Sequence, residues 1–101
     1  MANERIQVTV ARDLEDLIPA FMKRRHEDVG KLRHALDSGD VETLRVTGHS
    51  MKGTGGGYGF LGLSEIGAAI EGAAKEGRLD AVRDCVGRLE DYLARVEVRF
   101  E

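Results

Sequence analysis

The hydrophobic positions of this chain recur mostly with the period of an α-helix. Pro19 interrupts the early part of the first stripe, because proline lacks an amide hydrogen and clashes with the preceding turn. The pattern therefore predicts a short helix near residues 12–18 and a long helix near 19–37. The apolar residues that share this stripe after Asp13 are Leu14, Leu17, Ile18, Phe21, Met22, Val29, Leu32 and Leu36.

Three further apolar stripes follow, separated by short turns. We expect Gly39 to end the long helix in the left-handed conformation, and Asp40 to cap a helix that begins at Val41 and ends by Gly59. Asp80 is a candidate cap for the last helix. The stripes consist of Val41, Leu44, Gly48, Met51 and Gly55; of Leu63, Ile66, Ile70, Ala73 and Ala74 as far as Gly77; and of Val82, Cys85, Val86, Leu89, Leu93 and Val96.

Strand-like alternation occurs only at residues 6–10, and it is too short and too isolated to predict a sheet. The fold class is therefore predicted to be all-α. Because the turns are only a few residues long, consecutive helices should be antiparallel neighbours. We expect one domain over residues 1–101, an up-down-up-down four-helix bundle with a short leading N-terminal helix and a core over about 13–100.

Composition and charge exclude several classes of function. The 101 residues carry 15 Lys and Arg against 18 Asp and Glu, so the net charge of -3 has the wrong sign for binding nucleic acid. No membrane segment is expected, because no long apolar run occurs and the first residues lack an apolar stretch. The single cysteine, Cys85, allows no internal disulfide, and no Cys/His cluster predicts a metal. These features favour a cytoplasmic protein.

Glycine is concentrated in one part of the chain. Six of the 13 glycines lie between Gly53 and Gly62. A glycine inside a helix costs about 1 kcal/mol relative to alanine, so this concentration needs a reason. A loop or a close approach of two helices would explain Gly55, which lies on the apolar stripe. Neither reason accounts for Gly53 and Gly56.

The histidine just before these glycines is the main candidate for chemistry. The side chain of His49 points away from the apolar stripe, so it is not a core histidine. Arg45 precedes it by one turn, Lys52 and Gly53 follow by one turn, and Gly56 follows by two. The cations complement an anion carried on the imidazole, and the glycines leave room for a second macromolecule. This arrangement suits a phosphoryl group on His49, supported by Lys52 and Arg45, with Gly53 and Gly56 giving a partner access.

Two other readings of the same residues are weaker. Residues 57–62 match the dinucleotide pattern G-x-G-x-x-G, but no strand precedes them and no strand-helix alternation surrounds them. Lys52 precedes Gly53, so the Walker pattern is absent as well. Ser50 is adjacent to His49 in sequence, and adjacent helix residues do not face each other as a catalytic pair requires.

The spacing of His49, Lys52, Gly53 and Gly59 reproduces the signature H-x-x-K-G-x5-G of histidine-containing phosphotransfer (HPt) domains, which the chain resembles over roughly residues 13–100. The departures are mild, with Met51 where the family often has leucine and extra glycine at residues 55–57. The resemblance implies a phosphorelay protein of two-component signalling that carries a phosphoryl group on Nε2 of His49.

The resemblance also implies the partners and the cofactors. A response-regulator receiver domain supplies the aspartate and the Mg²⁺, and a histidine kinase or hybrid kinase is the other partner, so no intrinsic cofactor is expected. The protein is then a phosphocarrier and not an enzyme. Two alternatives stay open: an interaction module whose His49 is never phosphorylated, and the phosphorylatable domain of a larger hybrid kinase.

The remaining candidates are expected to be structural. His26 and His34 lie off the apolar stripe and are predicted to be solvated, as is the basic run at residues 23–25. Cys85 is expected to be a small buried hydrophobe. Packing is expected for Tyr58 and Phe60. The acidic residues Glu65, Glu71 and Glu76 are predicted to form an ordinary solvated helix face.

Overall fold

The computed structural model of the chain describes residues 4–101 and is mostly helical, which confirms the predicted helical character. The segment expected as a short leading helix is a 3₁₀ helix, η1. The elements follow in the order β1 (Ile6–Val10), η1 (Arg12–Leu17), α1 (Ile18–Ser38), α2 (Val41–Tyr58), α3 (Leu61–Lys75), α4 (Leu79–Arg95) and β2 (Val96–Phe100).

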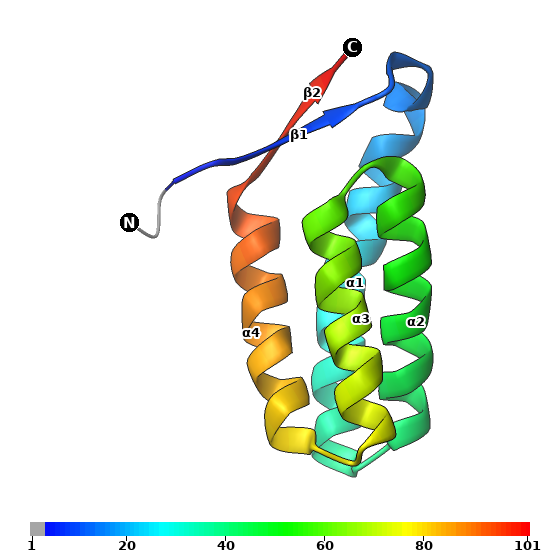
Figure 1. Cartoon of the computed structure of the whole chain (residues 1–101), viewed down its shortest axis with the longest axis vertical. Coiled ribbons are helices and arrows are strands. Elements are labelled where there is room, and N and C mark those ends of the chain that lie inside the picture. Colours follow the sequence, from blue (N-terminus) through cyan, green and yellow to red (C-terminus); the bar gives the residue numbers. More distant parts are fainter. Residues whose placement is uncertain (1–3) are drawn as a thin grey trace.

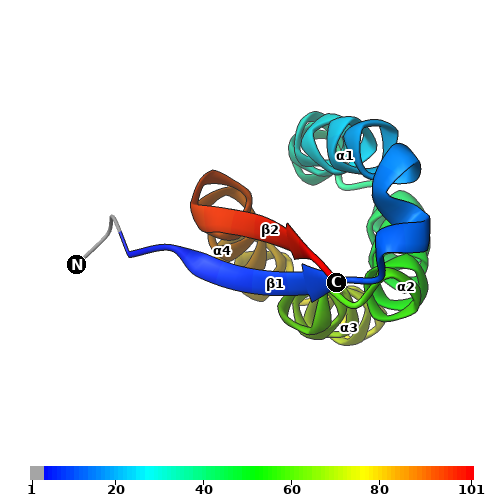
Figure 2. The ribbon, with the colours of Figure 1, turned by 90° about the horizontal axis from the view of Figure 1, so that it is seen from above.

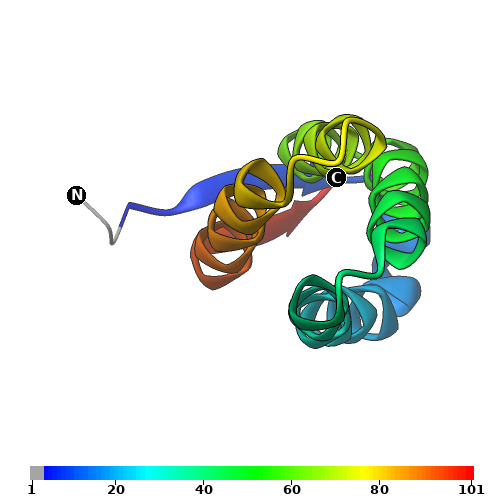
Figure 3. The same cartoon turned by 90° about the horizontal axis from the view of Figure 1, so that it is seen from below.

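The four α-helices lie side by side along the long axis of the molecule (Figure 1). The turns that join α1 to α2 and α3 to α4 lie at one end, and the turn from α2 to α3 lies at the other. Seen from below, the helices follow one another around the molecule, and α1 contacts both α2 and α4 (Figure 3). The apolar stripes meet in one core, whose fully buried side chains include Leu32, Leu44, Met51, Phe60, Leu63, Ile70, Val82, Val86 and Leu89.

The helix ends follow the local signals of the sequence. Gly39 ends α1 with a φ of 69°, and Gly59 ends α2 with a φ of 92°, both in the left-handed region that favours glycine. The Asp40 side chain accepts a hydrogen bond from the amide of Thr43 at 3.1 Å, so the predicted cap of α2 is confirmed. The predicted cap of α4 is wrong. Arg78 occupies that position without a side-chain bond, and Asp80 lies in the first turn.

A small sheet contradicts the prediction that residues 6–10 are too isolated to pair. β1 pairs in parallel with β2, with Ile6 opposite Val96 and Val10 opposite Phe100. The sequence placed Val96 on the last helical stripe, whereas it begins the strand. A five-residue alternation after a helix resembles a continuing stripe, and its partner lies at the other end of the chain. The amide of Glu101 donates to the carbonyl of Val10 at 3.1 Å, which extends the pairing.

Glycine brings the backbones of α2 and α3 into direct contact. A Cβ added to Gly67 would lie 2.5 Å from the amide nitrogen of Lys52 and 2.8 Å from the carbonyl oxygen of Gly48. A Cβ at Gly48 would lie 2.7 Å from the amide nitrogen of Glu71. A Cβ added to Gly55 would lie 2.8 Å from the amide nitrogen of Ser64, so of the two reasons offered for this glycine the close approach of two helices applies. Val41, expected on this buried face, is instead 37% exposed.

This contact predicts unequal effects of two glycine substitutions on the same helix. Gly67→Ala should lower the free energy of unfolding by about 2 to 3 kcal/mol, because the new methyl group forces α2 and α3 apart. Gly72→Ala is the matched control, since a Cβ there meets nothing within 4 Å and alanine is the better helix former. Urea unfolding of both variants measures the difference. Equal stabilities would contradict the close packing.

Candidate functional site

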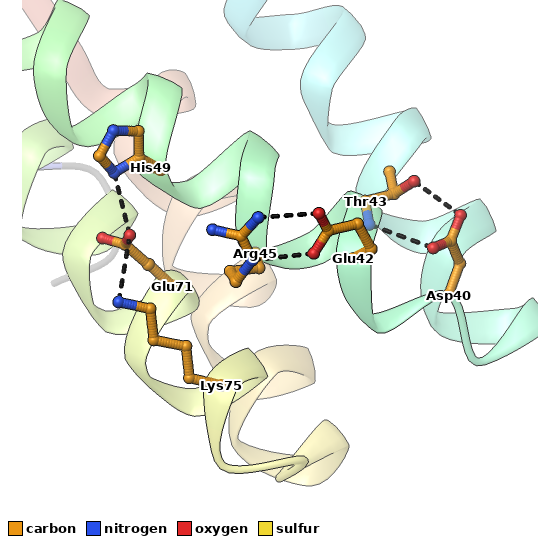
Figure 4. A network of polar contacts seen from close by, with 7 residues as sticks. All are labelled: Asp40, Glu42, Thr43, Arg45, His49, Glu71 and Lys75. Carbon is orange, nitrogen blue, oxygen red and sulfur yellow. Dashed lines mark hydrogen bonds and ion pairs between the residues drawn. The ribbon is translucent and has the colours of Figure 1, made fainter.

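His49 lies midway along α2 with its side chain 65% exposed, yet its ring is held from one side. Nδ1 lies 2.9 Å from Oε2 of Glu71, which extends from α3 toward it (Figure 4). A neutral imidazole that donates from Nδ1 to a carboxylate keeps the lone pair on Nε2. The contact therefore orients the ring and leaves Nε2 as the nucleophilic atom.

Glu71 is the centre of the polar cluster around His49. Its side chain is only 9% exposed, and Lys52 Nζ lies 3.1 Å from Oε1. Lys75 Nζ lies 3.6 Å from Oε2. The hydrogen bond from Lys52 is the main cause that lowers the pKa of Glu71 to about 2, aided by the bond from His49 and by the charges of both lysines, while burial opposes the shift. Glu71 is therefore a carboxylate at neutral pH.

The prediction that Glu71 lies on a solvated helix face is wrong, and its position follows from the glycine contact. Gly67 precedes Glu71 by one helical turn, so the two lie on the same side of α3. Gly67 faces the backbone of Gly48, which immediately precedes His49. Because the two backbones meet there, a glutamate on α3 is close enough to reach a histidine on α2.

The structure brings two of the predicted site residues together and places the others around them. Lys52 and His49 both contact the carboxylate of Glu71, which links the two side chains. Arg45 instead pairs with Glu42 on its own helix, with nitrogen-to-oxygen distances of 2.9 and 2.8 Å. Figure 4 shows this pair on the same stretch of α2 as His49.

Gly53 and Gly56 are exposed on the turns of α2 that follow His49. A Cβ at Gly53 meets nothing within 4 Å, and one at Gly56 meets only the Ser64 hydroxyl at 3.6 Å. The surface of α2 after the histidine is therefore bare backbone at these two positions.

Sequence reasoning missed Glu71 and Lys75. One signal was present: the two residues are four apart with the acid first, which is the favourable order for an ion pair on a helix. That pattern is common on solvated helices, so it did not single out the site. The contact with His49 depends on the packing of α3 against α2, which no local pattern reveals.

Most of the other candidates are structural, with one correction. Cys85 is buried, and Phe60 and Tyr58 both stack on Phe21, with ring centroids 5.0 and 4.5 Å apart, as expected. His26 and His34 are exposed. The basic run at residues 23–25 is not wholly solvated, because Arg25 is buried. It pairs with Asp28 at 3.1 Å and donates to Thr54 Oγ1 at 2.6 Å.

Residues 4–101 contain neither a cluster of metal ligands nor a helix suited to cross a membrane. No group of three or more histidine, cysteine or acidic residues in this part of the chain is arranged to hold a metal ion. None of the helices described combines the length and the apolar character that crossing a membrane requires.

Comparison with known families identifies the class of protein. The family model of the Hpt domain matches residues 9–98, which is most of the chain. The chain therefore belongs to the Hpt domain family, the histidine phosphotransfer domains of two-component signalling. Hpt domains are phosphocarriers that interact with receiver domains and histidine kinases. The searches of curated proteins and of solved structures gave no match.

The lowered pKa of Glu71 predicts a pH-dependent contribution to stability. A carboxyl with a depressed folded-state pKa stabilises the fold above its unfolded value of about 4.3, and this stabilisation is lost as the pH falls toward the folded value of about 2. Wild type should therefore exceed Glu71→Gln in stability at pH 7, and the gap should close toward pH 2.

Denaturant unfolding of both proteins at a series of pH values measures this gap. Glu65→Gln, at an exposed position of the same helix, is the control and should show no comparable gap. A gap between wild type and Glu71→Gln that does not depend on pH would contradict the ion cluster.

Proposed function

We propose that His49 accepts a phosphoryl group on Nε2 and donates it to a partner, relaying it between receiver-domain aspartates or from a histidine kinase. The observation that carries this proposal is the exposed ring of His49, fixed at Nδ1 by a carboxylate in a chain of the Hpt family. We further propose that residues 1–101 act as one phosphotransfer domain in the cytoplasm, with no cofactor of their own.

The transfer needs no proton to leave the histidine. The Nε2 lone pair attacks the phosphorus of an aspartyl phosphate, the new N–P bond forms, and the bond to the aspartate oxygen breaks with release of a carboxylate. The ring then carries positive charge, which the Glu71 carboxylate stabilises through the Nδ1 hydrogen bond. Transfer in the other direction reverses these steps.

The lysines supply charge for the phosphoryl oxygens. Phosphoryl transfer depends mainly on positioning and on stabilising spread negative charge. Lys52 Nζ is held by Oε1 of Glu71, and Lys75 Nζ lies near Oε2, the oxygen that His49 also contacts. We propose Lys52 as the main contact to the phosphoryl group. Arg45 adds positive charge one turn away, partly offset by its pair with Glu42.

The partner completes the reaction centre. We propose that a receiver domain docks over Gly53 and Gly56 and brings its own aspartate and Mg²⁺. Any side chain at these glycines would stand between the receiver and His49, since both lie on the exposed side of α2. The receiver's acidic centre, in turn, would meet the lysines around Glu71.

Substitution of the histidine tests the proposal directly. His49→Gln should accept no phosphoryl group from a phosphorylated receiver or an active histidine kinase, while His26→Gln and His34→Gln should accept one as wild type does. The fold should be unchanged, because the His49 side chain is largely exposed. Intact-mass analysis with and without acid treatment detects the label, and circular dichroism checks the helices. Labelling of His49→Gln, or no labelling of wild type, would overturn the assignment; the second result would favour an interaction module.

The role of Lys52 is tested by rate. Lys52→Ala should slow phosphorylation of His49 about tenfold, because a charge-assisted contact to the phosphoryl oxygens is lost. Lys52→Arg should keep part of the rate, since it keeps the charge and changes the geometry. Single-turnover transfer at low salt measures the three proteins, with Lys23→Ala as the control at an exposed position of α1. Equal rates would show that Lys52 is an ordinary surface lysine.

A further inference from the structure

The outer face of β2 carries two charged side chains that form no ion pair with the part of the chain that the structure describes. Val96, Val98 and Phe100 pack against the core, so Glu97 and Arg99 point to the other face and are exposed. Their cross-strand neighbours on β1 are the uncharged Gln7 and Thr9. Within residues 4–101, neither Glu97 nor Arg99 takes part in an ion pair.

The strand that carries these charges also has an unpaired edge. Among residues 4–101 the sheet consists of β1 and β2 alone, so each strand pairs on one side only. Figure 1 shows the sheet at one end of the molecule, beyond the ends of α3 and α4, and Figure 2 shows both strands from above. An unpaired strand edge is a ready template for another strand, because it presents amide and carbonyl groups without backbone partners. On β2 the carbonyl of Phe100 accepts a hydrogen bond from the exposed Arg12 side chain at 3.3 Å, which a pairing strand would have to displace.

The order of charges along β2 is complementary to itself in one register. If a second copy of β2 runs antiparallel with Val98 opposite Val98, Glu97 of each copy faces Arg99 of the other. If the pairing were centred on Glu97 or on Arg99 instead, that charged residue would face the same residue of the other copy. Because opposite charges across strands stabilise a pair and like charges destabilise it, the pattern favours the register centred on Val98.

We propose that the chain self-associates through the edges of β2 into a two-fold symmetric dimer, with a four-stranded sheet in the order β1-β2-β2-β1. A two-fold axis at Val98 makes both copies contribute the same edge, as an isologous interface requires. The edge is short, so the dimer is weak and reversible. His49 lies midway along α2 and takes no part in this contact. The proposal is therefore independent of phosphoryl transfer.

Charge reversal separates this interface from unspecific association. Sedimentation velocity of the 101-residue chain, at concentrations up to about 1 mM, should show a monomer that converts to a dimer. Glu97→Arg should raise the dissociation constant about tenfold or more, since Arg then faces Arg in both symmetry-related pairs. Arg99→Glu should do the same. The double variant Glu97→Arg/Arg99→Glu should dimerise as wild type does, because it restores opposite charges.

Mixing the two single charge-reversal variants gives the most specific test of the interface. Glu97→Arg and Arg99→Glu should each be largely monomeric alone and should form a heterodimer together. Asp84→Arg and Arg83→Glu reverse exposed charges on α4 and serve as matched controls that leave the association unchanged. A chain that is monomeric at about 1 mM, or a dimer that ignores the charge reversals, would overturn the proposal.

Discussion

The close contact between the backbones of α2 and α3 is the constraint on which the candidate site depends. Gly48 and Gly67 face each other where any Cβ would collide with backbone atoms of the opposite helix. The two residues of the site that come from different helices, His49 and Glu71, lie directly next to this contact. At the ordinary separation of 8 to 10 Å between helix axes, larger side chains would fill the interface and hold the carboxylate away from the ring. The glycines therefore permit the close packing of the two helices and also place the Glu71 carboxylate beside the His49 ring.

The second determinant is the charge balance at Glu71. A carboxylate this shielded from solvent is unfavourable unless it is paired and hydrogen-bonded, and here two lysines and the imidazole fulfil that condition. The same arrangement keeps Lys52 near the ring before any phosphoryl group is present. A phosphoryl group on Nε2 would add a second anion beside Lys52, so this cation would already be in place when the receiver brings its Mg²⁺. Preorganisation of this kind lowers the cost of stabilising charge during transfer.

The features that were predicted correctly from the sequence are those that depend on residues close together along the chain. Gly39, Asp40 and Gly59 act through local backbone geometry, and their roles at the ends of α1 and α2 were correct. The exposure of His49 followed from helical periodicity alone. Glu71 and β2 were missed because each acquires its role from a partner distant in sequence: Glu71 from His49 on another helix, and β2 from β1 at the other end of the chain.

The sheet holds α1 and α4 in place relative to each other, as the glycine contact holds α2 against α3. These two helices are the first and the last of the bundle, so no turn joins them, and their exposed ion pair between Arg33 and Glu90 adds little stability. β1 leads through η1 into α1, and β2 continues directly from α4. Pairing of the two strands therefore ties the beginning of α1 to the end of α4, with Val8 and Val10 buried against the core beneath them. Since α1 and α4 also pack on each other, this tie holds the helices around one core while α2 remains free to present His49 on its outer side.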